Sequence, residues 1–258
     1  MESPHGAALS AEDFGLKGPR GWAFRGVDLA AGPGSLVAVE GPSGSGRTCL
    51  LLALTGRMRS THGHAEVGGE RLPGRLAAVR GFSALGPVPG VSELDPSLTV
   101  AEHLRERALL RRRFGGSPRS LLRPRAERAA AARAVIDTAL EAAGLDPAAL
   151  PKAERTSVRD LERPEALRLS VALALMGRPR LLAVDDTDLK LSATDRGPVW
   201  ELLRTIAAGG TTVLAVCSEA PEDALTVRTR PAAGPPAPAD DTTTGKGTAD
   251  AIAGTGRS

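Results

Sequence analysis

The sequence predicts an α/β protein with a mostly parallel core sheet, an N-terminal antiparallel β region and an inserted helical subdomain. One observation is a pair of short apolar runs, at residues 181–184 and 211–217, that are separated by a helical pattern. Apolar strands that alternate with helices are typical of a parallel sheet covered on both faces. A second observation is a glycine-rich turn at residues 41–48, between an apolar strand-like run at 36–39 and an apolar helical run at 50–54. Strand, glycine-rich turn and helix in this order frame a phosphate-binding loop.

The first third of the chain predicts the antiparallel β region. Residues 1–15 predict a flexible N-terminus, because Gly and Pro interrupt the start of the chain. Residues 22–29 alternate between apolar and polar side chains and predict a strand. Residues 64–72 contain a Gly-Gly pair between two short strand-like runs, which predicts a β-hairpin. A further weak strand is expected over residues 79–85.

The middle of the chain, from about residue 97 to 175, predicts the helical subdomain. A first helix begins near Leu98, with Thr99 as N-cap and Glu102 three residues later. A second helix is expected over residues 125–143, where apolar residues recur every three or four positions. Further helices are expected at 167–176 and 199–207. Residues 229–258 are rich in Pro, Gly and small polar residues, so they predict a disordered tail.

Composition narrows the function classes. The chain has 258 residues and a formal net charge of +3, which is too little to indicate nucleic-acid binding. Many arginines gather between residues 105 and 128; they form either a solvated helical surface or a patch for nucleic acid or anionic lipid. Two cysteines indicate no disulfide framework. With no signal peptide and no membrane-length apolar run, we expect a cytoplasmic protein that reaches the membrane only through a partner.

The glycine-rich turn supplies the candidate nucleotide-binding residues. Its glycines permit a tight backbone curl, so that successive N–H groups converge on a phosphate at the start of a helix. Thr48 stands where a hydroxyl would hold Mg²⁺, and Arg47 stands where the motif has Lys. Arginine is a longer planar fork that can still pair with phosphate. The alternative is a glycine-rich turn that binds nothing. The candidate residues are Gly41, Ser43, Gly44, Ser45, Gly46, Arg47 and Thr48.

The apolar strand at residues 181–184 ends in two acids, Asp185 and Asp186. A carboxylate at a strand end is a natural partner of a phosphate loop, so Asp185 is predicted to hold Mg²⁺ together with Thr48. Asp186 is the candidate catalytic residue, because it would orient or deprotonate an attacking water. The alternative interpretation is a strand end whose acids face solvent.

With these two elements, residues 20–220 resemble the ATP-binding subunit of ABC transporters, a P-loop NTPase fold. The run at 177–186 is similar to that family's Walker B segment, and residues 161–165 stand at the place of its LSGGQ signature. The resemblance implies an ATP-binding domain over residues 16–228, with ATP and Mg²⁺ as cofactors. It also implies a transmembrane partner subunit and a homodimer or heterodimer with an ABC-type subunit.

The functional positions of the family are substituted in this chain. Asp186 stands for the catalytic Glu and is one methylene shorter, which displaces the water. In the signature, Pro164 removes an N–H and Glu162 places a negative charge beside phosphate. No Gln occurs around Gly86, and Trp22 is the candidate to stack on adenine. The substituted positions are Arg47, Glu162, Arg163, Pro164, Asp186, Thr187, Asp188, Ser192 and Ser218.

Three functions are compatible with this pattern. The first is a nucleotide-binding subunit that couples Mg-ATP to a membrane partner, with weak hydrolysis. The second is a catalytically inactive pseudo-ATPase, a degenerate family member that acts as a structural or regulatory nucleotide-binding module. The third is a binder of nucleic acid or anionic lipid through the arginines at 105–128. A small-molecule kinase is an outlying alternative, for which the sequence shows no substrate site.

Overall fold

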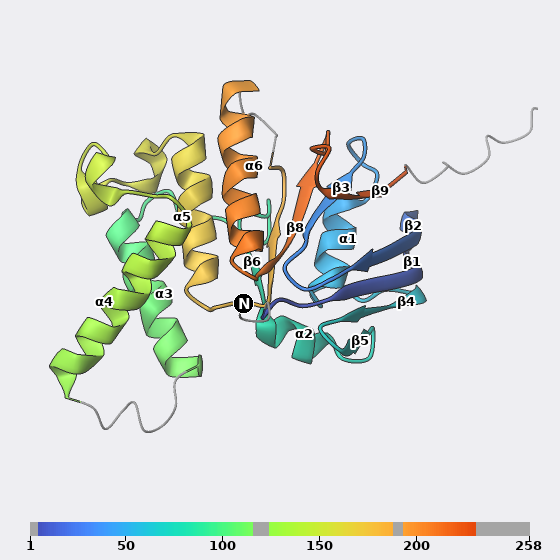
Figure 1. Ribbon diagram of the computed structural model, residues 1–258, viewed down its shortest axis with the longest axis horizontal. Helices are drawn as coiled ribbons and strands as arrows, with labels where there is room; N and C mark the ends of the chain where they lie inside the picture. Colours follow the sequence, from blue (N-terminus) through green and yellow to red (C-terminus); the bar gives the residue numbers. More distant parts are fainter. Residues whose placement is uncertain (1–4, 116–123, 188–192, 231–258) are drawn as a thin grey trace, which may run out of the picture.

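The computed structural model describes residues 5–115, 124–187 and 193–230, and it has three parts that Figure 1 shows side by side. A four-stranded antiparallel sheet and a five-stranded parallel sheet pack together, and a helical subdomain stands beside them. This is the α/β architecture that the sequence predicts. Within the described ranges, no helix is long and apolar enough to cross a membrane. Ser192 and the predicted tail from residue 231 onward lie outside these ranges.

The antiparallel sheet has the strand order β2-β1-β4-β5. The predicted flexible N-terminus is wrong from residue 9 onward, because β1 pairs with β2 on one side and β4 on the other. Its apolar side chains, Leu9, Ala11 and Phe14, are buried. Register shifts between Ala11 and Phe14 break the alternation of buried and exposed positions, and this irregularity hides the strand in the sequence. The strands are β1 (Leu9–Gly18), β2 (Gly21–Ala31), β4 (His62–Val67) and β5 (Glu70–Leu72).

The second sheet has the strand order β6-β7-β8-β3-β9, and every neighbouring pair is parallel. The weak strand expected over 79–85 is wrong in its first half, where the chain forms a short helix, α2 (Leu76–Phe82), before β6 begins. Strand β9 is not among the predicted strands. The strands are β3 (Leu36–Glu40), β6 (Ser83–Leu85), β7 (Leu181–Val184), β8 (Thr212–Cys217) and β9 (Leu225–Arg228).

Successive residues of the parallel strands pack into two hydrophobic clusters. In β7, Leu182 and Val184 belong to the cluster formed with α6 (Ala193–Ala208) and the helical subdomain. Leu181 and Ala183 belong to the cluster formed with α1 (Arg47–Leu54) and the antiparallel sheet. Side chains of a strand alternate between its faces, so a strand with a core on each face must be apolar throughout. This explains the uninterrupted apolar runs in the sequence.

Besides the short α2, the described part of the chain has five longer α-helices. Three of them form the helical subdomain that stands beside the sheets (Figure 1): α3 (Val100–Gly115), α4 (Arg125–Ala142) and α5 (Arg163–Leu175). The predicted cap of the first subdomain helix is confirmed, because the Glu102 N–H donates to the Thr99 hydroxyl at 3.3 Å and the Thr99 N–H donates to Glu102 Oε2 at 2.8 Å. The helix expected at 167–176 begins earlier, because Glu162 and Glu165 form a capping box. The other two long helices are α1 (Arg47–Leu54) and α6 (Ala193–Ala208).

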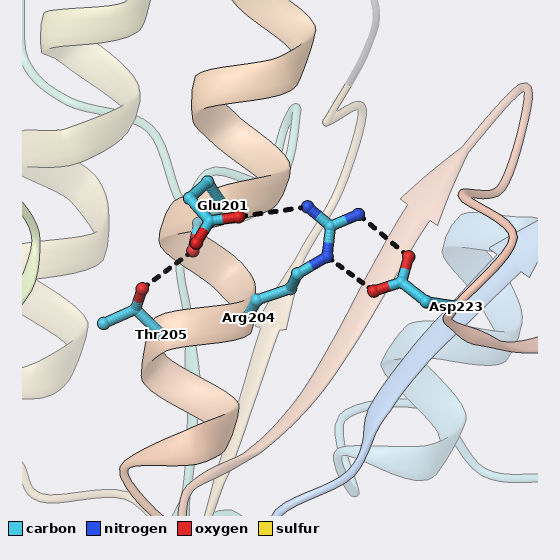
Figure 2. A network of polar contacts seen from close by, with 4 residues as sticks. All are labelled: Glu201, Arg204, Thr205 and Asp223. Carbon is cyan, nitrogen blue, oxygen red and sulfur yellow. Dashed lines mark hydrogen bonds and ion pairs between the residues drawn. The ribbon is translucent and has the colours of Figure 1, made fainter.

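A polar network fastens the β8–β9 connection to α6 (Figure 2). The Arg204 guanidinium donates two hydrogen bonds to Asp223, at 2.6 and 2.8 Å, and a third to Glu201 at 3.3 Å. These hydrogen bonds hold the pKa of Asp223 below its ordinary value. The bidentate geometry is the strongest form of an arginine–carboxylate contact. It fixes the segment that leads into β9, the strand next to β3.

Candidate functional site

The predicted phosphate loop leaves the carboxyl end of β3 and enters α1. Gly44 and Gly46 both adopt left-handed backbone angles, with φ of 79° and 84°. A Cβ on Gly46 would lie 1.9 Å from the Ala23 carbonyl oxygen, whereas a Cβ on Gly44 would meet nothing within 4 Å. Strand β2 of the antiparallel sheet therefore lies directly against the end of the loop, and only glycine fits there.

The buried side of the loop contacts the residue that follows β9. The Ser45 hydroxyl has no exposed surface and lies 2.7 Å from the Thr229 hydroxyl. The Thr229 N–H donates to the Glu40 carbonyl at 2.9 Å. Thr229 is only 5% exposed, so the predicted disordered tail does not begin at residue 229. The prediction missed this residue because no local pattern marks it; the pairing of β9 with β3 brings it there.

The carboxylate predicted to hold Mg²⁺ lies next to the loop. The Thr48 hydroxyl donates to Asp185 Oδ2 at 2.6 Å, and the Asp186 N–H donates to Asp185 Oδ1 at 2.9 Å. Asp185 is 2% exposed, and burial raises the pKa of its carboxyl while the Thr48 hydrogen bond opposes that rise. A hydroxyl and a carboxylate are hard oxygen ligands of the type that Mg²⁺ prefers. The two residues therefore fit a magnesium site in type and in position.

Asp186, the candidate catalytic residue, follows Asp185 at the same end of β7. Its φ is 50°, in the left-handed region that non-glycine residues rarely occupy. Such backbone strain costs on the order of 1–3 kcal/mol and is concentrated at functional sites. Its side chain is half-buried. The structure thus brings Asp186 to the loop but gives no contact that assigns its role.

Arg47, which replaces the motif lysine, contacts the end of a neighbouring strand. Its Nη1 donates to the Cys217 carbonyl, the last residue of β8, at 2.5 Å. Cys217 precedes Ser218, which stands at the family's switch-histidine position. The first residue of α1 therefore contacts the last residue of β8.

Trp22, the candidate to stack on adenine, lies in β2 beside Ala23. Its ring lies against the His62 ring, with centroids 4.4 Å apart and a tilt of 57°. The Lys17 ammonium stands 5.8 Å from the Trp22 ring centroid. The side chain is half-buried, so part of the ring faces solvent.

The signature-like segment lies in the helical subdomain, at the start of α5 (Figure 1). Glu162 is the N-cap, and its carboxylate accepts the N–H of Glu165. In return, the Glu162 N–H donates to Glu165 Oε2 at 2.8 Å. Pro164 occupies the first turn and has no N–H. At the start of α5, the backbone N–H groups of Glu162 and Glu165 therefore donate to carboxylates of the chain itself. The structure does not bring this segment to the chain's own phosphate loop.

A glycine turn between the parallel strand β3 and a helix, beside a carboxylate at the end of β7, two strands away in the sheet, defines an α/β protein of the phosphate-loop class. The model of the ABC transporter family matches residues 24–188. The chain therefore belongs to the ABC transporter family.

Curated relatives agree with this assignment. The chain is 33% identical over 188 residues to the Nod factor export ATP-binding protein I of Cupriavidus metallidurans, which covers 73% of this chain and 55% of the relative. It is 32% identical over 189 residues to the protein of the same name from Paraburkholderia xenovorans, with the same coverage. The chain spans about half the length of these curated relatives.

Solved structures show the same fold. A dimeric ATP-binding cassette, MJ0796, bound to ADP and Pi, superposes with a TM-score of 0.62 at 20% identity; the match covers 82% of this chain and 88% of that chain. An ATP-binding subunit of an ABC transporter superposes with a TM-score of 0.59 at 20% identity, over 81% of this chain and 79% of that chain. At these identities the likeness establishes the fold alone. The predicted fold is thus confirmed.

Proposed function

We propose that this chain is an ABC-type ATP-binding protein that binds Mg-ATP at residues 41–48 and couples it to a transmembrane subunit. The observation that carries the proposal is the hydrogen bond between Thr48 and Asp185, which joins the glycine loop to a buried carboxylate. Membership of the ABC transporter family supports ATP as the nucleotide. The relatives that are named export ATP-binding proteins support the coupling role.

Each loop residue has a distinct part in this proposal. The backbone N–H groups at 41–48 and the start of α1 would surround the phosphates, because free N–H groups at a helix start attract anions. Thr48 and Asp185 would hold Mg²⁺, which neutralises phosphate charge when bound. Arg47 would contribute its guanidinium in place of the lysine, after releasing the Cys217 carbonyl. Trp22 would offer an aromatic face to the base.

We further propose that hydrolysis is weak and that the chain is a degenerate member of its family. Asp186 is shorter than the glutamate it replaces, and a misplacement of about 1 Å can cost on the order of 100-fold in rate. The capping box at Glu162 supports the same view, because it occupies the helix start that a partner's phosphate would need. In a dimer, this segment would complete the nucleotide site of the partner subunit. That site would then bind or hydrolyse nucleotide less well than the other one.

The partner surface is proposed on the helical subdomain. Leu109 and Leu110 on α3 are 56% and 43% exposed, and the exposed Arg111 follows them. Apolar and basic side chains together suit docking to a membrane subunit. The protein would then act at the cytoplasmic face of a membrane, as a homodimer or heterodimer with an ABC-type subunit. The small net charge gives no support to nucleic-acid binding.

A pseudo-ATPase is the second candidate, and the capping of α5 by Glu162 is the observation that favours it. In that case nucleotide binding stabilises one conformation and no turnover follows. The two candidates share the binding step and differ only in phosphate release.

Calorimetry of Mg-ATP binding tests the shared step, with Arg47→Lys and Arg47→Ala beside the unchanged protein. The proposal predicts micromolar binding that Arg47→Ala abolishes and Arg47→Lys retains or strengthens. Absence of binding in the unchanged protein would refute it. Phosphate release then separates the two candidates, with Asp185→Ala as the inactive reference. Release at the rate of that reference selects the pseudo-ATPase.

A further inference from the structure

The residue after β9 is part of the packing beneath the phosphate loop. The Thr229 hydroxyl lies 2.7 Å from the Ser45 hydroxyl and 3.4 Å from the Glu40 carbonyl oxygen. Both hydroxyls are buried. Glu40 is the last residue of β3, and Ser45 is the fifth residue of the loop. Thr229 therefore bridges the strand that leads into the loop and the middle of the loop itself.

Thr229 lies close against the first residue of the loop. A Cβ on Gly41 would lie 2.5 Å from the Thr229 hydroxyl oxygen and 2.7 Å from both the Ser45 hydroxyl and the Thr229 carbonyl oxygen, so there is no space for a side chain at Gly41. The Ser45 N–H closes the turn by donating to the Pro42 carbonyl at 3.2 Å. Thr229 is therefore packed against both Gly41 and Ser45.

The Thr229 hydroxyl contacts two acceptors. It donates to the Glu40 carbonyl over a long 3.4 Å, and either hydroxyl can be the donor in the shorter bond between Thr229 and Ser45. The Ser45 hydroxyl is then held by a partner from a distant part of the chain. A buried hydroxyl that loses its partner is costly, so the loop would rearrange to satisfy Ser45 elsewhere. The backbone N–H groups of the same turn would rearrange with it.

We propose that Thr229 is a positioning residue for the phosphate loop, which sets nucleotide affinity through Ser45 and Gly41 without touching the ligand. This inference rests on the proposed nucleotide binding at residues 41–48. It assigns a role to the residue after β9, which no pattern in the loop motif indicates.

A purely structural role for Thr229 makes a different prediction. Strand β9 is fastened to β3 by backbone pairing, and the Thr229 N–H donates to Glu40 whatever side chain is present. Valine has the shape of threonine, so Thr229→Val removes the hydroxyl and keeps the strand. Thr226 offers the matched control, because it lies in β9, three residues before Thr229, and its hydroxyl donates to the Ala224 carbonyl at 3.2 Å.

The experiment measures Mg-ADP affinity by calorimetry and thermal unfolding for Thr229→Val, Thr229→Ser and Thr226→Val. Thr229→Val is expected to weaken binding about fivefold to tenfold, the factor that one hydrogen bond accounts for. Thr229→Ser restores the hydroxyl and should bind within about twofold of the unchanged protein. Thr226→Val should leave the affinity unchanged. Ser45→Ala should reduce the affinity, and its combination with Thr229→Val should reduce it no further.

Two results would overturn the inference and leave the proposed function intact. One is unchanged affinity in Thr229→Val. The other is a loss of affinity in Thr226→Val of the same size, accompanied by the same loss of thermal stability, which would indicate a general weakening of β9. If the unchanged protein binds no Mg-ADP and no Mg-ATP, the proposed function fails and this inference fails with it.

Discussion

Replacing Gly46 by alanine is expected to destabilise the protein far more than replacing Gly44 by alanine. Both glycines have a positive φ, at 84° and 79°. Their surroundings differ. A Cβ on Gly46 would lie 1.9 Å from the Ala23 carbonyl oxygen and 2.6 Å from its carbonyl carbon, whereas Gly44 has nothing within 4 Å. The pair therefore separates backbone strain from steric overlap.

The magnitude follows from these two contributions. A left-handed backbone costs a non-glycine residue roughly 1–2 kcal/mol, and both variants bear this cost. Gly46→Ala must also move β2 or the start of α1, and overpacking of this kind costs about 1–3 kcal/mol. The free energy of unfolding should therefore fall by about 1–2 kcal/mol in Gly44→Ala and by about 2–5 kcal/mol in Gly46→Ala.

Urea unfolding followed by tryptophan fluorescence measures both losses. Trp22 lies in β2 beside Ala23, so its emission reports the strand that Gly46→Ala displaces. Trp200 lies buried in α6, and Trp200→Phe provides a background in which Trp22 is the only tryptophan. In that background, Gly46→Ala should shift the native emission and Gly44→Ala should not. Equal losses of stability in the two variants would refute the close contact between β2 and the loop.

Three further predictions concern the helical subdomain. Leu169→Ala in α5 should lower the free energy of unfolding by about 2–5 kcal/mol, because its side chain is fully buried, and the exposed Leu110→Ala should change it little. Glu162→Ala should cost about 0.5–2 kcal/mol, because it removes the cap of α5. Glu102→Gln should flatten the acid dependence of the melting temperature. Hydrogen bonds from Thr99 lower the pKa of Glu102 below 4.5, so its stabilisation is present above that pH and lost as pH falls through the folded pKa.

Specific results would contradict these predictions. Similar losses in Leu169→Ala and Leu110→Ala would place the core elsewhere than in α5. Glu162→Ala without any loss, in urea unfolding followed by circular dichroism, would mean that the capping box does not form. A variant Glu102→Gln with the same melting temperature as the unchanged protein at every pH would show that the Thr99 hydrogen bonds contribute nothing to stability.

The phosphate loop and its acids could be predicted from the sequence because their patterns are local. The turn at 41–48 and the strand before Asp185 each lie within about a dozen residues. The structure places the turn and Asp185 at the carboxyl ends of strands in the same parallel sheet. Thr229 could not be predicted in this way. It lies 184 residues from Ser45, and only the pairing of β9 with β3 brings the two hydroxyls together.

The start of α5 shows why a local signal can be misread. Comparison with the family treats Glu162 and Pro164 as departures from a signature, and the predicted helix begins at residue 167. In the structure the same residues are ordinary helix-start residues, with a capping glutamate and a proline in the first turn. A glutamate followed three residues later by a second glutamate, with a proline between them, is itself a helix-start pattern, so the local chemistry predicts the start of α5 independently of the family signature.

The loop is held in place mainly by partners other than the family's catalytic side chains. Gly46 fits against a backbone carbonyl of β2, Ser45 pairs with Thr229, and Arg47 donates to the Cys217 carbonyl. Backbone groups and one distant hydroxyl remain available whatever occupies the catalytic positions. A substitution at Asp186 therefore leaves these contacts of the loop in place. Under the proposed function, nucleotide binding and hydrolysis would depend on separate sets of contacts, so a chain with this fold could lose the second and retain the first.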